Sequence, residues 1–265
     1  MSNEELKIAY YLLQKEYRPF MDILTEKQYE PSYQLYRGFD ASPSKLIYRP
    51  DILFLAYNPS GGVDYWRLNH HPHLFLWPHL NERELMFFGK NAARKGGEWY
   101  ELDKEENNSF PRQIVDLLYV LASMKYPGKD NERGTNKKPF WADDFKNSMV
   151  YLNLYPIATE DGDKLVRLFR KLHKDKDLSM NFKNEWQLRM YFINIMHKMV
   201  SLISPKVIVC MGAQTFHDYT YSERCNHTIN EIMTDAKYDN LIGFSRRGAW
   251  DGNIDNIAKA IADRI

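Results

Sequence analysis

The chain has 265 residues, of which 44% are hydrophobic, so it can bury a substantial core as one large α/β domain or two small ones. We predict a single domain over 1–265. The net charge of +1 excludes a global basic field, so any contact with nucleic acid has to come from local patches. The two cysteines, Cys210 and Cys225, exclude a disulfide framework and a four-cysteine iron–sulfur cluster.

The same features bear on location. A chain with so few cysteines is typical of a reducing cytoplasm. No apolar run approaches the roughly 20 residues of a membrane span, and the acidic start Met-Ser-Asn-Glu-Glu is unlike a signal peptide. We therefore expect a cytoplasmic protein that makes no membrane contact.

The first 45 residues are predicted to form a helical extension. Apolar side chains recur near helical spacing from Glu4 to Leu24, which predicts a helix that packs on the core. Its buried face comprises Leu6, Tyr10, Leu13, Tyr17 and Phe20. The turn-rich stretch from Tyr29 to Lys45 is predicted to connect this helix to the first core strand.

An apolar run beginning at Asp51 predicts a strand that is buried on both faces and that ends at Asn58. Ligands of parallel α/β sheets bind at the carboxyl ends of the strands, so Asn58 is a candidate site residue. After Pro59 stops the strand, Ser60 and Gly61 leave backbone N–H groups free to approach an anion. A plain strand-to-loop turn is the alternative, and the motif alone favours it.

The segment 63–110 shows no strong periodicity but is rich in aromatic residues, among them Tyr65 and Trp66. It also contains His70, His71 and His73, which invite a zinc interpretation. Neither a cysteine nor a His-x-x-x-His pair on a predicted helix accompanies them, so we predict loop histidines and no metal site.

The second half of the chain alternates strands with helices. Helices are predicted at Gln113–Met124, Glu185–Ser204, Ala213–Tyr221 and Asn253–Arg264, and a helix with its exit over Lys164–Lys176. Strands are predicted at Met149–Asn153, Val207–Gly212 and from Leu241. The helix from Lys164 is basic, and the helix from Glu185 carries a core stripe that includes Trp186. This alternation predicts a mostly parallel sheet between two helical layers, a three-layer α/β/α sandwich with four strands.

Taken in order, four stretches resemble the uracil-DNA glycosylase-like superfamily. They are the strand ending in Asn58, the strand carrying Asn153 with Pro156 beyond it, the run from Val207 to Gly212, and the end of the last strand at Ser245-Arg-Arg. The second stretch looks most like the single-strand-selective and mismatch-type branches. The resemblance covers the chain from about Asp51 onward.

This resemblance implies a role for each matching residue. Asn58 would orient the catalytic water through its carbonyl oxygen, because a carboxamide does not ionise. Asn153 would read the edge of a flipped pyrimidine with one donor and one acceptor, a pattern that fits uracil in one orientation of the amide and cytosine in the other. Tyr57, Tyr65 and Trp66 are the expected base-binding rings.

The C-terminal loop departs from the family pattern, which has a His that stabilises the leaving base. Here the loop reads Phe244-Ser-Arg-Arg-Gly-Ala-Trp250, and Arg246 is the expected replacement as a cation near the developing oxyanion. Phosphate contacts are expected from Ser60, Gly61, Ser245, Arg246 and Arg247. Trp250 or Arg247 would wedge into the base stack.

The predicted function is therefore that of a monofunctional DNA glycosylase without a cofactor, acting as a monomer on DNA. Its base would be uracil or, given the altered loop, a modified pyrimidine such as the glucosylated hydroxymethylcytosine of phage DNA, which would make it an anti-phage enzyme. A non-catalytic nucleic-acid-binding module of the same fold is the main alternative. A phosphate-binding turn at Tyr57–Gly62 is weaker, because no glycine-rich nucleotide motif follows any strand.

Overall fold

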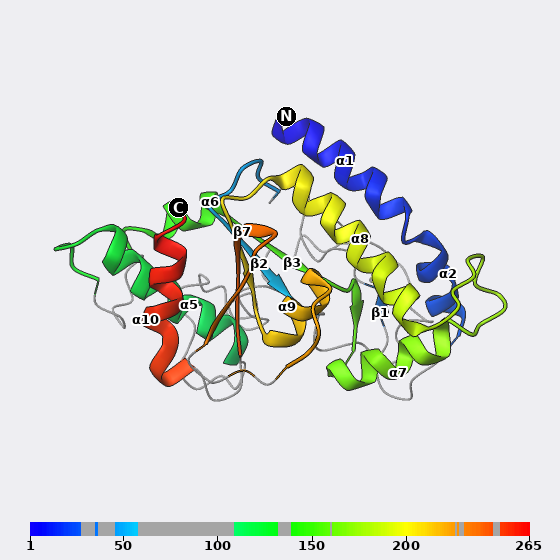
Figure 1. Cartoon of the computed structure of the whole chain (residues 1–265). Coiled ribbons are helices and arrows are strands. Elements are labelled where there is room, and N and C mark those ends of the chain that lie inside the picture. Colours follow the sequence, from blue (N-terminus) through cyan, green and yellow to red (C-terminus); the bar gives the residue numbers. More distant parts are fainter. Residues whose placement is uncertain are drawn as a thin grey trace. The chain divides into compact units, whose positions relative to one another are not determined.

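A computed structural model describes residues 1–27, 35–36, 46–57, 109–131, 139–159, 161–225, 227, 231–245 and 250–265. Described residues within Met1–Arg49, Leu55–Glu82 and Tyr151–Ser204 form a first compact unit. Those within Pro50–Phe54, Arg83–Val150 and Pro205–Ile265 form a second (Figure 1).

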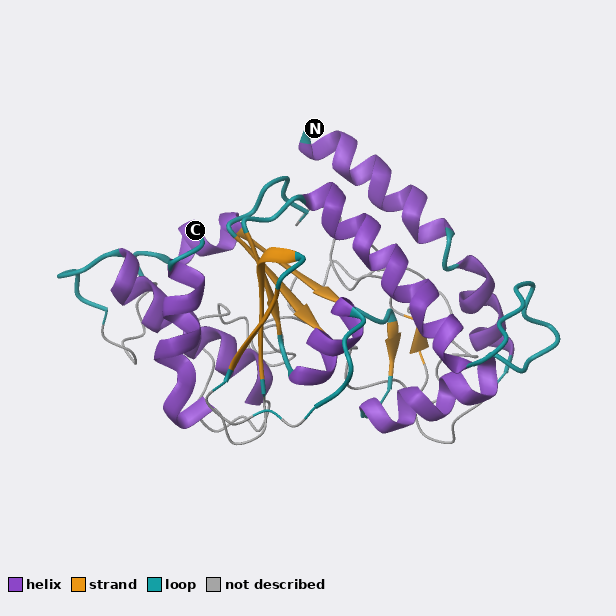
Figure 2. Ribbon diagram, in the orientation of Figure 1, coloured by secondary structure: helices purple, strands orange, loops and turns teal. Residues whose placement is uncertain are grey.

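The described part of the chain contains a five-stranded sheet with the order β3-β2-β5-β7-β6 (Figure 2). Its strands are β2 (Ile52–Ala56), β3 (Met149–Asn153), β5 (Val207–Cys210), β6 (Ile232–Asp235) and β7 (Tyr238–Phe244). β5 pairs in parallel with β7, where Ile208 lies opposite Leu241, and β6 pairs antiparallel with β7. The first residues of β2 and β3 belong to the second unit and their last residues to the first.

The predicted strands at all four positions are confirmed, and the number of strands is corrected. β2 and β5 are buried along their whole length, as their uninterrupted apolar runs indicate. The additional strand is β6, an edge strand of which only Met233 is buried. Such a short alternating segment carries little periodic signal, which is why the sequence predicts four strands and not five. The α/β class with a mostly parallel sheet stands.

The first unit contains α1 (Asn3–Lys15), α2 (Arg18–Glu26), α7 (Gly162–Leu172) and α8 (Glu185–Ile203), with a short antiparallel pair of β1 (Leu35–Tyr36) and β4 (Ile157–Ala158). Aromatic rings form the core of this unit around Phe192 of α8. Its ring centroid lies 4.7 Å from that of Phe20 and 5.5 Å from those of Tyr17 and Phe169. The N-terminal extension therefore contributes to a core, as predicted.

Two predictions for the helices of this unit are wrong in detail. The single helix expected from Glu4 to Leu24 is two helices, because Pro19 lies in the first turn of α2 and starts a new one. The predicted core faces of both are buried, at Leu6, Tyr10, Leu13, Tyr17 and Phe20. Trp186, predicted to be core, is 40% exposed on the first turn of α8.

The second unit contains α5 (Ser109–Lys125), α6 (Ala142–Ser148), α9 (Ala213–Thr220) and α10 (Trp250–Ala262). α10 packs along α5, and α9 packs on β7. At that contact a Cβ atom on Gly243 would lie 2.7 Å from Cδ2 of Phe216, so the strand has room for no side chain there. No described helix is long and apolar enough to cross a membrane.

Candidate functional site

Asn153 is the last residue of β3 and is completely buried. The hydroxyl of Tyr151 donates a hydrogen bond to Oδ1 of Asn153 at 3.0 Å. These two side chains lie on the same face of the strand, because residues two apart in a strand point the same way. Tyr151 therefore holds the amide in one orientation at the carboxyl end of the strand.

The carboxyl end of β2 lies directly beside that of β3. Leu154 N donates to Ala56 O at 2.8 Å and Tyr155 N donates to Tyr57 O at 3.0 Å. The segments that follow β2 and β3 therefore continue side by side beyond the strands. The rings of Tyr57 and Tyr155 meet edge to face with centroids 5.0 Å apart. The structure thus brings Tyr57, the last described residue of the first motif, to the sheet edge that carries Asn153.

Arg189 of α8 is a member of this site that the sequence analysis missed. Its side chain is almost fully buried, with Nε 3.3 Å from the hydroxyl of Tyr155 and an Nη atom 3.4 Å from the hydroxyl of Tyr57. Glu185, one turn earlier, lies 3.7 Å from the guanidinium, which also stacks over the Trp186 ring. Helical periodicity could have identified it. Arg189 lies four residues after Glu185 and three before Phe192, so it falls on the buried face of the helix.

These groups give the site a defined chemical character. Asn153 and Tyr155 are completely buried, Tyr57 is half-buried, and the guanidinium of Arg189 lies 3.7 Å from the carboxylate of Glu185. A cation held in a water-poor site stabilises negative charge near it, here that of Glu185.

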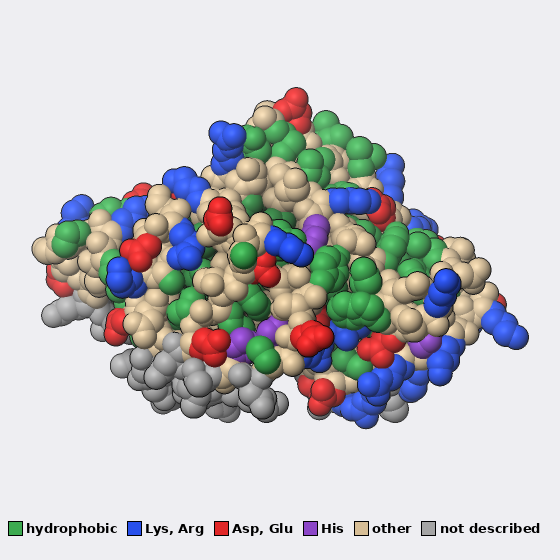
Figure 3. All heavy atoms as spheres, viewed as in Figure 1, with side chains coloured by type: hydrophobic (Ala, Val, Ile, Leu, Met, Phe, Trp, Pro, Cys, Tyr) green, Lys and Arg blue, Asp and Glu red, His purple; other side chains and the backbone are tan. Residues whose placement is uncertain are grey.

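A basic surface belongs to the same unit as this site. It is formed by α7 and the residues that follow it, and comprises Lys164, Arg167, Arg170, Lys171, Lys174 and Lys176. Figure 3 shows Lys and Arg side chains gathered at the lower right of the viewed face, where α7 lies in Figure 1. One of them, Arg170, pairs with Glu185 at 3.0 Å. We call these residues the α7 basic face.

The remaining sequence-predicted site residues are less informative. Asn58, Ser60, Gly61, Tyr65, Trp66, Arg246 and Arg247 lie outside the described residues, as do His70, His71 and His73. Ser245 follows β7 directly in the second unit and is half-buried. Trp250, expected in a loop, is the first residue of α10.

Among the described residues, one group has side chains placed to hold a metal ion: His217, Cys225 and His227 of the second unit. No family model matches the chain, and no curated protein matches it either.

Proposed function

We propose that this protein is a DNA glycosylase that binds a flipped pyrimidine and hydrolyses its N-glycosidic bond. The observation that carries the proposal is the buried, tyrosine-held Asn153 at the end of β3, hydrogen-bonded through the next two residues to the end of β2. A base reader and a water-orienting residue have to approach the same nucleotide. Asn58 follows Tyr57 directly in the sequence, and we propose that both amides act on this nucleotide.

In the proposed mechanism Asn153 pairs with the polar edge of the base, and Tyr151 sets which amide atom faces it. One of the expected base-binding rings, Tyr57, Tyr65 or Trp66, stacks on the base. Arg189 fixes Tyr57 through its hydroxyl. Asn58 orients water toward C1′, the glycosidic bond breaks toward an oxocarbenium-like state, and the base leaves as an anion that takes up a proton. Arg246 stabilises that anion, and the α7 basic face, Ser60, Gly61, Ser245 and Arg247 contact phosphates.

The proposal includes the finer expectations from the resemblance. These are a three-layer α/β/α arrangement, a cytoplasmic monomer without a cofactor in the reaction, and DNA as the partner. The altered C-terminal loop, Phe244-Ser-Arg-Arg, favours a substrate other than plain uracil. A glucosylated hydroxymethylcytosine of phage DNA is the substrate we propose first.

An abasic-site assay tests the function. DNAs containing uracil, mismatched thymine, hydroxymethylcytosine or its glucosylated form are incubated with the wild type and with the Asn58→Ala and Asn153→Ala variants, then treated with alkali. We expect strand breaks at one modified base with the wild type, and at least about 100-fold fewer with either variant. Ile8→Ala, a change at a side chain of α1 that is 60% exposed in the same unit, serves as a control.

Two results would count against the proposal. Strand breaks that persist undiminished in Asn58→Ala would show that Asn58 does not orient the catalytic water. No breaks on any DNA, with DNA binding retained, would favour the non-catalytic binding module.

A further inference from the structure

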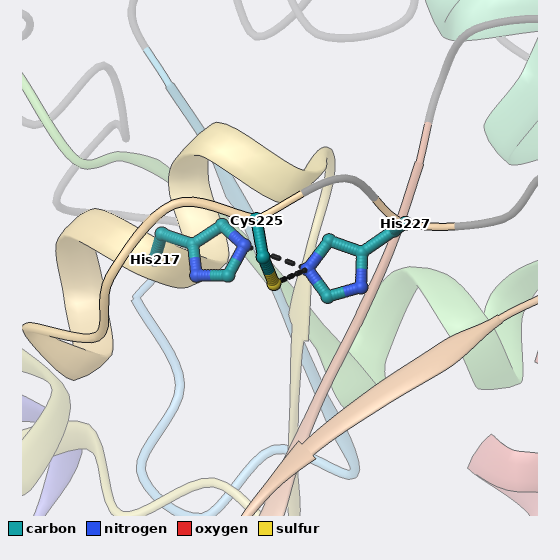
Figure 4. A group of neighbouring side chains, drawn as sticks. All are labelled: His217, Cys225 and His227. Carbon is teal, nitrogen blue, oxygen red and sulfur yellow. Dashed lines mark hydrogen bonds between the residues drawn. The ribbon is translucent and has the colours of Figure 1, made fainter.

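The segment after α9 folds back on the helix and brings three potential metal ligands together (Figure 4). Tyr221 ends α9 with a φ of 55°, in the left-handed region, and Ser222 N donates to His217 O at 3.0 Å. This turn reverses the chain. Cys225 and His227 consequently face His217, and the ligand atoms of the three side chains all lie within 4.8 Å of one another.

The two imidazole rings present their Nε2 atoms to each other. These nitrogens are 2.7 Å apart, and Sγ of Cys225 lies 3.3 Å from Nε2 of His227. The rings stack with centroids 4.8 Å apart. His217 is almost fully buried and the side chain of His227 is 9% exposed, whereas Cys225 is exposed and open to solvent.

The hydrogen bonds around His217 place its proton on Nδ1. The hydroxyl of Thr220 donates to Phe216 O at 2.9 Å, so its oxygen can only accept from Ser222, 2.8 Å away. That contact uses the single hydroxyl proton of Ser222. Nδ1 of His217, 2.7 Å from the same Ser222 oxygen, therefore has to be the donor, which leaves Nε2 of His217 with a lone pair.

The same result follows for His227. Its buried Nδ1 makes no well-aligned hydrogen bond among the described residues but lies 2.9 Å from a carboxylate oxygen of Glu231. A carboxylate only accepts, so this contact favours a proton on Nδ1 and a lone pair on Nε2. Two lone pairs then face each other across 2.7 Å and repel unless a cation lies between them.

We propose that His217, Cys225 and His227 bind a Zn²⁺ ion. Two imidazole nitrogens and a thiolate are the ligand set that zinc takes in proteins, and a fourth tetrahedral position remains for water. Nitrogens about 2.0–2.1 Å from a tetrahedral ion lie roughly 3.3 Å apart, so a small opening of the histidine pair admits the ion. Cys225 binds as the thiolate and releases its proton to solvent.

The groups behind the ligands match those of protein zinc sites. Ligating histidines donate their second N–H to a carboxylate or another oxygen, which fixes the ring and its tautomer. Nδ1 of His217 donates to Ser222 in this way, and a carboxylate oxygen of Glu231 lies 2.9 Å from Nδ1 of His227. The ion would also fasten the segment between α9 and β6, because Cys225 and His227 lie on that segment. This site does not depend on the proposed glycosylase activity.

The test uses the full-length protein after removal of metal by a chelator and dialysis. Competition with a chromophoric chelator should show one Zn²⁺ bound per chain, and Co²⁺ should give a thiolate-to-cobalt charge-transfer band with tetrahedral visible bands. We expect Cys225→Ser to lose the charge-transfer band and His227→Gln to weaken zinc binding at least about tenfold. Glu231→Gln keeps all three ligands and should weaken binding about 10–100-fold.

Matched controls separate this site from other ligands in the chain. Cys210→Ala removes the other cysteine, which is buried in β5, and should retain the band. Replacement of His70, His71 and His73 by Ala should also retain it. Should a ligand variant fold poorly by circular dichroism, the wild type alone still tests the site, since Zn²⁺ should raise its Tm.

Three outcomes would overturn the proposal. The first is zinc binding that is unchanged in Cys225→Ser, and the second is binding that is lost only when His70, His71 and His73 are replaced. The third is a wild type that binds no stoichiometric zinc and shows no cobalt spectrum, which would leave a hydrogen-bonded pair of imidazoles.

Discussion

Single side chains fix the geometry of the candidate site, and Arg189 is the clearest case. Its guanidinium contacts two tyrosine hydroxyls and a carboxylate from one buried position. An arginine fork makes several such contacts at fixed angles, whereas a lysine makes them from one flexible point. Arg189 therefore links α8 to the carboxyl ends of β2 and β3 inside the first unit.

Replacement of Arg189 by methionine should destabilise the protein by about 1–3 kcal/mol. The change keeps much of the apolar stem but leaves the hydroxyls of Tyr57 and Tyr155 and the carboxylate of Glu185 with one partner fewer. Urea unfolding measures the difference. Arg167→Met on the exposed side of α7 is the control and should change stability by less than about 0.5 kcal/mol. Equal effects of the two substitutions would show that the buried contacts contribute nothing.

A second residue, Tyr126, should make stability depend on alkaline pH. Burial and its hydrogen bond to Asp144 raise the pKa of Tyr126 from 10.0 to about 12. The folded state thus favours the neutral phenol, and the resulting stability is fully present below about pH 10 and is lost as the pH rises toward 12. The stability difference between wild type and Tyr126→Phe should therefore shrink across this range in urea unfolding. A difference that stays constant, or one that Tyr11→Phe reproduces, would contradict this.

At the scale of elements, the packing of α9 on β7 depends on the absence of a side chain at Gly243. A methyl group there would meet Cδ2 of Phe216 at 2.7 Å and its Cβ at 2.9 Å. Rotation of the ring relieves the first contact but not the second, so the helix itself has to shift. Gly243→Ala should cost about 1–3 kcal/mol.

A double-mutant cycle with Phe216→Ala checks the cause of that cost. Phe216→Ala removes Cγ and Cδ2, two of the three nearest atoms, so the cost of Gly243→Ala should be smaller in that background. Strictly additive free energies of unfolding would place the strain elsewhere.

Elements that bury an apolar surface along their whole length were predictable, and those that do not were missed. Ile52–Ala56 and Val207–Cys210 are buried at every position, and the helix from Glu185 buries a long stripe, so composition and period identify them. The edge strand Ile232–Asp235 lacks this signal. Contacts that a reversal of the chain creates have no periodic signal in the sequence either. The approach of Cys225 and His227 to His217 depends on the left-handed turn at Tyr221.

The candidate site likewise has features that the sequence predicts and features that it does not. The position of Asn153 at the end of a strand follows from the apolar run before it, but alternation of strands and helices does not fix the strand order that puts β2 beside β3. The hydrogen bond from Tyr151 and the contacts of Arg189 depend on side-chain placement within the packed unit. Periodicity assigns a residue to a face but does not select its partner.

At the scale of the whole molecule, the net charge of +1 means that long-range attraction to DNA is weak. The DNA binding that we propose then depends on where positive charges gather, and the α7 basic face is such a place. Arg167, Lys174 and Lys176 are all exposed on it. Each lysine or arginine that neutralises a phosphate adds about 0.9 to the slope of log Kobs against log salt on duplex DNA.

The triple variant Arg167→Ala, Lys174→Ala, Lys176→Ala should therefore bind duplex DNA more weakly at low salt, with a slope smaller by about 1–3. The control triple Lys7→Ala, Arg18→Ala, Lys198→Ala removes the same number of positive charges from α1, α2 and α8, where each is paired with a carboxylate. Fluorescence anisotropy at several salt concentrations measures both. An equal change of slope in the two variants would mean that DNA responds to total charge, and the α7 basic face would lose its role as the contact surface.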